Sequence, residues 1–237
     1  MFWSPGPIPA GVKPRAVLLD ALGTLLSLEP PAPRLRAGLR SAFGIDVGEE
    51  AAARVVRAEI AYYRAHLHQA GDTAGLADLR TRCAAVVREG LELDLPVADV
   101  EPVLLDSLHF EAFPDAEPAL RDLRQAGMAL VVVSNWDVSL HDVLARTGLR
   151  PLVDAAVSSA EAGSAKPDRA IFARALALAR AQAAEAWHVG DSIDADVEGA
   201  RRAGIVPVLI DRDSILEHPG VAEVRRITSL AELAALI

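Results

Sequence analysis

The sequence predicts an α/β fold in which a Rossmann-like parallel sheet is flanked by helices and an all-helical cap is inserted after the first strand. Between residues 129 and 210, short apolar runs alternate with helical patterns, which is typical of βαβ units. The segment 28–110, in contrast, contains helical patterns and no run that resembles a strand. We therefore expect three parts: an N-terminal arm (1–14), an α/β core (15–27 and 111–237) and a helical cap (28–110).

The strands of the core are predicted from continuous apolar runs, because a strand that is covered on both faces carries apolar side chains at every position. The first run is residues 16–19, and the second, residues 129–133, ends in three consecutive valines. Three further runs predict strands at residues 155–157, 186–189 and 206–210. We expect these strands to form one parallel sheet.

Helices are expected between these strands, since parallel neighbours need a long crossover connection. The helix at residues 120–126 is followed by a glycine, which is typical of a helix C-terminus. A second helix begins at residues 166–168, with Pro167 as its first helical residue. A third covers residues 194–203, with Asp194 as its N-cap.

The inserted segment is expected to form a separate helical unit. Its four helical patterns lie at residues 34–43, 49–70, 76–90 and 97–108. Apolar side chains recur on one face of the second pattern, as in a helix that packs against its neighbours: Val55, Val56, Ile60, Tyr63 and Leu67. A stiff proline-rich linker (30–33) is predicted before these helices, and a return linker (110–115) after them.

The composition argues against several classes of protein. The net charge of −9, from 24 basic and 33 acidic residues, disfavours a nucleic-acid-binding surface. No apolar run reaches the ~18 residues of a membrane span, and residues 1–14 lack the apolar stretch of a signal peptide. Cys83 is the only cysteine, so no disulfide can form within the chain. We expect a cytoplasmic protein that binds neither nucleic acid nor membrane.

Polar side chains follow the predicted strands at the sheet edge where open α/β folds bind their ligands. Asp20 follows the first strand, and Ser134 and Asn135 follow the second. Lys166 precedes a helix after the third, and the segment 190–196 supplies further carboxylates. A carboxylate nucleophile, a hydroxyl donor, an ammonium group and further carboxylates suit attack on a phosphoryl group that is held by a hard divalent cation.

Two of these polar residues belong to types that the chain rarely uses. Asn135 is the only asparagine, and Lys166 is one of two lysines, whereas 22 of the 24 basic residues are arginines. A lysine carries a compact point charge that the planar guanidinium group of arginine does not reproduce. Their rarity favours a specific role for both residues.

Taken in order, the four polar segments resemble the four motifs of the haloacid dehalogenase (HAD) superfamily of hydrolases. The resemblance covers about residues 16–210, except for the insertion, which is similar to a type-1 cap in position and helicity only. Single motifs such as Gly-Asp-Ser are weak signals. Four motifs in order, with Ser-Asn-x-Asp and Lys-Pro-Asp, are specific.

The resemblance implies a role for each of these residues. Asp20 would attack phosphorus and form an aspartyl-phosphate, while Lys166 would neutralise charge on the nucleophile and on the phosphoryl group. Ser134, Asn135 and Lys166 would bind the substrate. A Mg²⁺ ion would be held by the carboxylates of Asp20, Asp191 and Asp196 and by the backbone carbonyl of Leu22.

Leu22 is the point at which this sequence departs from most phosphatases of the superfamily, which have an aspartate two residues after the nucleophile. That aspartate protonates the leaving group and then activates water, and the loss of such a group costs typically ~10²–10⁴-fold in rate. We therefore expect a Mg²⁺-dependent phosphatase of reduced or leaving-group-limited activity, acting on a small phosphate ester or acyl phosphate. Alternatively, the proton comes from the substrate or from the cap, where the candidates are His66, His68 and His109.

Two further functions stay open from the sequence. A 2-haloacid dehalogenase needs no proton donor, because halide leaves as an anion. The dehalogenases of the superfamily, however, have an aromatic residue in place of Leu22 and lack the metal-binding pair that Gly190 and Asp191 form here. A phosphate-binding or regulatory protein would keep the pocket without efficient turnover. The departure at Leu22 resembles that of a HAD subgroup whose substrates are not defined, and the sequence predicts neither the substrate nor the oligomeric state.

Overall fold

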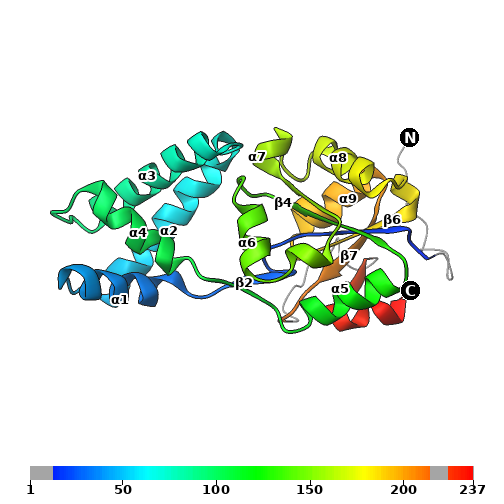
Figure 1. Cartoon of the computed structure of the whole chain (residues 1–237), viewed down its shortest axis with the longest axis horizontal. Helices are drawn as coiled ribbons and strands as arrows, with labels where there is room; N and C mark the ends of the chain where they lie inside the picture. Colours follow the sequence, from blue (N-terminus) through cyan, green and yellow to red (C-terminus); the bar gives the residue numbers. More distant parts are fainter. Residues whose placement is uncertain (1–12, 214–223, 237) are drawn as a thin grey trace.

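The computed structural model describes residues 13–213 and 224–236, so the predicted N-terminal arm lies almost entirely outside the described residues. The chain forms two lobes, an α/β core and a helical cap (Figure 1). A short antiparallel ribbon of β2 (Leu26–Leu28) and β3 (Phe110–Ala112) joins them. The ribbon was not predicted, because three-residue strands are too short to show an alternating pattern.

The described part of the core contains a six-stranded parallel sheet with the strand order β5-β4-β1-β6-β7-β8. Five strands lie where the apolar runs predict them: β1 (Ala16–Leu19), β4 (Ala129–Ser134), β5 (Ala155–Ser158), β6 (Ala186–Gly190) and β7 (Val206–Ile210). The sixth strand, β8 (Arg225–Ile227), was not predicted, because this edge strand has the sequence Arg-Arg-Ile and carries no apolar run. The predicted parallel sheet is confirmed.

Alternate residues of the strands pack into two apolar layers, one on each face of the sheet. Val17 and Leu19 belong to one layer, whereas Ala16 and Leu18 belong to the other. All four side chains are fully buried, which explains why the strand carries no polar residue. In the part of the core that the structure describes, five α-helices cover these layers or connect the strands: α5 (Ala116–Gln125), α6 (Leu140–Arg146), α7 (Ser159–Ala162), α8 (Arg169–Ala179) and α9 (Gly199–Ala203).

Two of the core helices begin differently from the prediction. The helix α8 begins at Arg169 rather than at Pro167, and the carboxylate of Asp168 caps it. Ser192 rather than Asp194 caps the π-helical turn Ile193–Glu198 that leads into α9. In both cases the residue with extended backbone and a short oxygen side chain becomes the N-cap, because it can accept a hydrogen bond from a free amide.

The cap buries an apolar cluster of its own, as its amphipathic patterns predict. The predicted proline linker is wrong, because Pro31 and Pro33 lie in the first turn of a helix, where a missing N–H group has no consequence. The four helices of the cap are α1 (Pro31–Phe43), α2 (Glu49–His66), α3 (Thr73–Gly90) and α4 (Val97–Ser107).

The cap contacts the core directly beside the carboxyl ends of the strands. Tyr63 Oη of α2 donates a hydrogen bond to Asp137 Oδ2 at 2.9 Å, in the loop after β4. In the same loop, the amide of Val138 donates to the carbonyl of Ala70 at 3.0 Å. These bonds hold the cap over the sheet edge where the predicted site lies.

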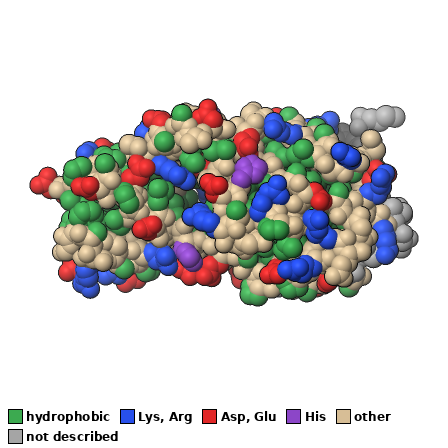
Figure 2. Space-filling view, viewed as in Figure 1, with side chains coloured by type: hydrophobic (Ala, Val, Ile, Leu, Met, Phe, Trp, Pro, Cys, Tyr) green, Lys and Arg blue, Asp and Glu red, His purple; other side chains and the backbone are tan. Residues whose placement is uncertain are grey.

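On the face shown in Figure 2, acidic and basic side chains are interspersed. Within the described residues, Leu178 is the one large hydrophobic side chain that is exposed, and no helix is long and apolar enough to cross a membrane.

Asp115 is expected to stabilise the core by holding its C-terminal segment. The carboxylate accepts two hydrogen bonds from Arg212, each at 3.0 Å, and others from Ser229 Oγ and the Leu230 amide. Replacing Asp115 with alanine is expected to lower the free energy of unfolding by about 2–3 kcal/mol, measured by urea denaturation at pH 7. Asp46 forms an exposed ion pair with Arg40, so Asp46→Ala is the control and should lose far less.

The stabilisation by Asp115 is expected to depend on pH. Partial burial alone would raise the pKa of Asp115, but the hydrogen bonds from Arg212, Ser229 and Leu230 hold that pKa below its usual value. The stabilisation is therefore complete above the unfolded-state pKa of about 3.9 and is lost as the pH falls through the lower folded-state value. An undiminished difference between wild type and Asp115→Ala at pH 2 would contradict this assignment.

Candidate active site

The candidate site is centred on Asp20, directly after β1. The chain leaves the strand through a turn at Gly23, whose φ of +85° favours glycine. Asp20 is buried, and its Oδ1 accepts hydrogen bonds from Ser134 Oγ at 2.9 Å and from Lys166 Nζ at 2.5 Å. Three predicted residues that are far apart in the sequence therefore meet at one carboxylate.

Lys166 connects this carboxylate to a second one. Its Nζ also donates to Asp196 Oδ1 at 2.6 Å, and all three side chains are buried. Burial alone would lower the pKa of Lys166, but the two carboxylates hold that pKa above its usual value. For Asp20, burial is the larger influence and raises the pKa, against the attraction of Lys166. The ammonium group is thus fixed as a positive charge beside the carboxylate at the strand end.

Asn135 holds Lys166 in place through the backbone. Its Nδ2 donates to the carbonyl of Lys166 at 3.0 Å, and its Oδ1 accepts a hydrogen bond from the amide of the same residue at 2.8 Å. Aspartate could accept but not donate, so this contact needs the amide side chain. For Asn135 we expected a contact with the substrate and not this pairing, although the rarity of asparagine and lysine in the chain was a signal.

His188 lies in β6 and is packed, as its position in a strand predicts. Its ring stands edge-on to Phe172 at a centroid distance of 5.0 Å, and its Nε2 lies 2.8 Å from Asp196 Oδ1. The other oxygen of Asp196 accepts a hydrogen bond from the amide of Ser192 at 3.0 Å. Burial alone would raise the pKa of Asp196, but Lys166 and His188 hold it well below its usual value.

Three carboxylates of the site could hold a divalent cation. Ligand oxygens of Asp20, Asp191 and Asp196 all lie within 4.8 Å of one another. Asp191 faces the cavity, where its partial burial and then the charges of the other two raise its pKa to about 7. A set of hard oxygen donors that repel one another fits Mg²⁺, which would relieve this repulsion.

Two glycines allow these carboxylates to approach the backbone so closely. A Cβ atom at Gly23 would lie 2.1 Å from Asp191 Oδ2, and one at Gly190 would lie 2.2 Å from Asp196 Cγ. Such distances exclude any side chain unless the carboxylates move. The glycines of the two motifs therefore serve the geometry of the acidic cluster.

A cavity of about 770 Å³ opens between the core and the cap above these residues. Asp20, Leu22 and Lys166 line its core side. Leu22 is half-buried and packs against the apolar layer of the core, so the position of the missing aspartate is filled by an aliphatic side chain. Trp136 also lines the cavity, and its ring packs against that of Phe110 in the ribbon at a centroid distance of 5.0 Å.

The cap histidines do not reach this cavity. His66 Nδ1 lies 2.7 Å from the carbonyl of Tyr62, in its own helix, and His68 is exposed. His109 lies beside the ribbon and pairs with Glu111 at 3.4 Å. None of the three is among the described residues that line the cavity, so the prediction that one of them replaces the missing proton donor gains no support.

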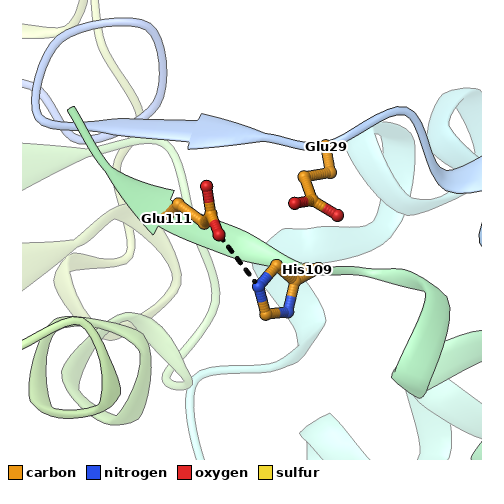
Figure 3. A group of neighbouring side chains, drawn as sticks. All are labelled: Glu29, His109 and Glu111. Carbon is orange, nitrogen blue, oxygen red and sulfur yellow. Dashed lines mark ion pairs between the residues drawn. The ribbon is translucent and has the colours of Figure 1, made fainter. Parts of the chain in front are cut away.

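A second group of ligand-type side chains lies at the ribbon. Glu29 follows β2, Glu111 lies in β3 and His109 directly precedes that strand. Figure 3 shows all three side chains close together. Glu29 already pairs with Arg34 at 3.0 Å, and the group is exposed or half-buried. We therefore treat it as part of the connection between the two lobes.

The fold and the site together define a Rossmann-like hydrolase core that carries an acidic cluster at the carboxyl end of its sheet, beneath a helical cap. The chain belongs to the haloacid dehalogenase-like hydrolase family, whose family model matches residues 14–204. The resemblance found in the sequence is thereby confirmed.

Individual relatives agree with this family. Haloacid dehalogenase-like hydrolase domain-containing protein 3 from Homo sapiens is 32% identical over 207 residues, which cover 83% of this chain and 81% of that protein. Phosphoserine phosphatase from Thermus thermophilus is 34% identical over 125 residues, or 52% of this chain and 50% of that enzyme. The HAD-hydrolase YfnB from Bacillus subtilis, solved bound to magnesium, shares the fold, with a TM-score of 0.70, 21% identity, and 94% and 98% of the two chains covered.

Proposed function

We propose that this hydrolase is a Mg²⁺-dependent phosphatase that acts through an aspartyl-phosphate on a small phosphate ester or acyl phosphate. The observation that carries the proposal is the buried contact of Asp20 with Ser134 and Lys166 beside two further carboxylates, at the base of a cavity large enough for a small molecule. Relatives that are named as phosphatases support the same reaction class.

The proposed chemistry divides between the residues as follows. A carboxylate oxygen of Asp20 forms a bond to phosphorus while the bond from phosphorus to the leaving group breaks, and the leaving group departs with the electron pair. Ser134 Oγ and Lys166 Nζ bind and neutralise the phosphoryl oxygens, and Asn135 keeps Lys166 in position. Water then cleaves the aspartyl-phosphate, which restores Asp20 and releases inorganic phosphate.

The metal would be held by Asp20, Asp191, Asp196 and the backbone carbonyl of Leu22. When bound, Mg²⁺ supplies positive charge that stabilises the phosphoryl group during transfer. The crowding of three carboxylates within 4.8 Å supports this assignment. It also favours a phosphatase over a 2-haloacid dehalogenase, since displacement of halide needs no metal.

Leu22 limits which leaving groups can depart. An aliphatic side chain neither donates a proton nor activates water, so leaving groups of low pKa are favoured. We expect p-nitrophenyl phosphate and acetyl phosphate to be hydrolysed at least ~10²-fold faster than alkyl phosphates. A catalytically weak phosphate-binding protein is the alternative that the same residue supports.

Removing divalent metal is expected to abolish the reaction. Treatment with EDTA should reduce hydrolysis of p-nitrophenyl phosphate by about 10²-fold or more, and added Mg²⁺ should restore it, measured as initial rates at pH 7.5. Release of chloride from a 2-haloacid in the presence of EDTA would support a dehalogenase instead. If neither p-nitrophenyl phosphate nor acetyl phosphate is hydrolysed, but vanadate with Mg²⁺ raises the melting temperature, the protein is a phosphate-binding protein.

A further inference from the structure

Glu59 is a buried carboxyl group on the cap side of the cavity, away from the acidic cluster. It lies in α2 and is only 3% exposed, yet it lines the same cavity as Asp20. Its cavity neighbours on α2 and α3 include Ile60, Leu76 and Leu79, which are apolar. Glutamate is seldom buried without a partner, because removing a carboxylate from water is costly.

The described residues supply no cation for this carboxyl group. The neighbouring polar group on α3 is the thiol of Cys83, which is a weak donor. Arg64, Arg80 and Arg146 also line the cavity, but none of them forms an ion pair with Glu59. Burial therefore raises the pKa of Glu59, with only a smaller opposing influence from Cys83. An apolar side chain of similar size would suit the cap better if Glu59 had only a structural role.

Glu59 lies where it could contact the part of a substrate beyond the phosphoryl group, that is, the leaving group. Tyr63, one helical turn later, bonds to Asp137, and Asp137 lies three residues after Ser134, which bonds to Asp20. One turn of α-helix advances about 5–6 Å along the axis. Glu59 is therefore one helical turn further from the strand ends than Tyr63 is. It faces the part of the cavity that the leaving group would occupy when the phosphoryl group lies at Asp20.

We propose that Glu59 is a specificity-determining residue that binds a positively charged amino group on the leaving group, so that the substrate is a phosphorylated amine. The ligand would bring the cation with which Glu59 is not paired. Two carboxyl groups of the described cap residues line the cavity, and of these Glu59 is buried whereas Asp106 is exposed. This inference rests on the proposed phosphatase function, because that function places the phosphoryl group at Asp20.

The test compares matched pairs of ligands as inhibitors of p-nitrophenyl phosphate hydrolysis. Aminoalkyl phosphates with two to four carbons are each paired with the alkyl phosphate of equal heavy-atom number. At the best chain length, the amine should bind about 10–100-fold more tightly than its alkyl partner. In Glu59→Gln this preference should disappear while the inhibition constants of the alkyl phosphates stay unchanged. Glu50→Gln, an exposed change on the same helix, should keep the preference.

Several outcomes would overturn the inference. They are an absent preference in the wild type, an equal preference in Glu59→Gln, or hydroxyalkyl phosphates that bind as tightly as the amines. Weaker binding of the alkyl phosphates in Glu59→Gln would point to a structural role instead. If the wild type does not hydrolyse p-nitrophenyl phosphate, the proposed function fails separately. Melting temperatures with Mg²⁺ and the same ligand pairs then decide whether Glu59 selects the amine.

Discussion

Replacing Asp20 with asparagine is expected to reduce the phosphatase activity by about 10⁴-fold or more, because an amide oxygen is a poor nucleophile toward phosphorus. Asparagine has the same shape and still accepts hydrogen bonds, so Ser134 and Lys166 should keep their places around it. The loss should appear in the chemical step. The measurement is the initial rate with p-nitrophenyl phosphate at saturating Mg²⁺, together with the melting temperature.

Asp194→Asn is the matched control for this variant. Asp194 lies three residues after Asp191, is exposed, and is not part of the acidic cluster. The control removes the same charge from the same sheet edge and should keep nearly full activity. If Asp20→Asn retained more than about a hundredth of the wild-type rate while folding normally, Asp20 would not be the nucleophile.

Replacing Leu22 with aspartate is expected to raise the rate on alkyl phosphates by about 10²–10⁴-fold. The new carboxyl group would stand at the cavity, two residues after Asp20, where it could protonate the leaving oxygen and then activate water. Acetyl phosphate and p-nitrophenyl phosphate should gain much less, since their leaving groups need little protonation. The measurement is kcat across leaving groups of graded pKa, and the dependence on that pKa should become shallower.

Leu22→Asn separates proton transfer from polarity at this position. Asparagine matches aspartate in size but cannot exchange a proton, so it should give no gain on alkyl phosphates. Leu22 is half-buried against the apolar layer of the core, so both variants lose similar packing. An equal gain in the two variants, or no gain in Leu22→Asp, would show that the missing acid is not what limits the reaction.

The core and the acidic site were largely predictable, because their signals are local. Each central strand is a short continuous apolar run, and a polar residue such as Asp20 directly after a run marks the strand end. Parallel strands bring their carboxyl ends to one edge, so Ser134 and Lys166 were expected beside Asp20. The structure places both on the same oxygen.

The partners of Asn135 and His188 were not predictable in the same way. Each contact depends on a residue from another segment, at a distance that no pattern in the sequence encodes. Asn135 pairs with the backbone of Lys166, 31 residues away, and His188 lies beside Asp196 across the turn after β6. A rare residue type signals that a position matters, but it does not say which atom it contacts.

Glu59 shows why the cap was harder to interpret than the core. Glu59 shares a helix face with Val55 and Tyr63, which lie four residues to either side. A charged residue on this apolar face was the one sign in the sequence that the position could have a special role. Periodicity separates buried from exposed faces, but it does not show that a buried face borders a cavity rather than a core. Glu59 therefore acquires a candidate role only once the cap lies over the strand ends.

The sequence by itself determined the family, the parallel sheet and the residues at its strand ends, because these follow from local hydrophobic runs and from motifs in a set order. Only the tertiary structure decided how Lys166 is held by Asn135, that the cap histidines stay away from the cavity, and that Glu59 faces it. Those features depend on which side chains meet when separate segments pack together, and packing is a property of the whole fold.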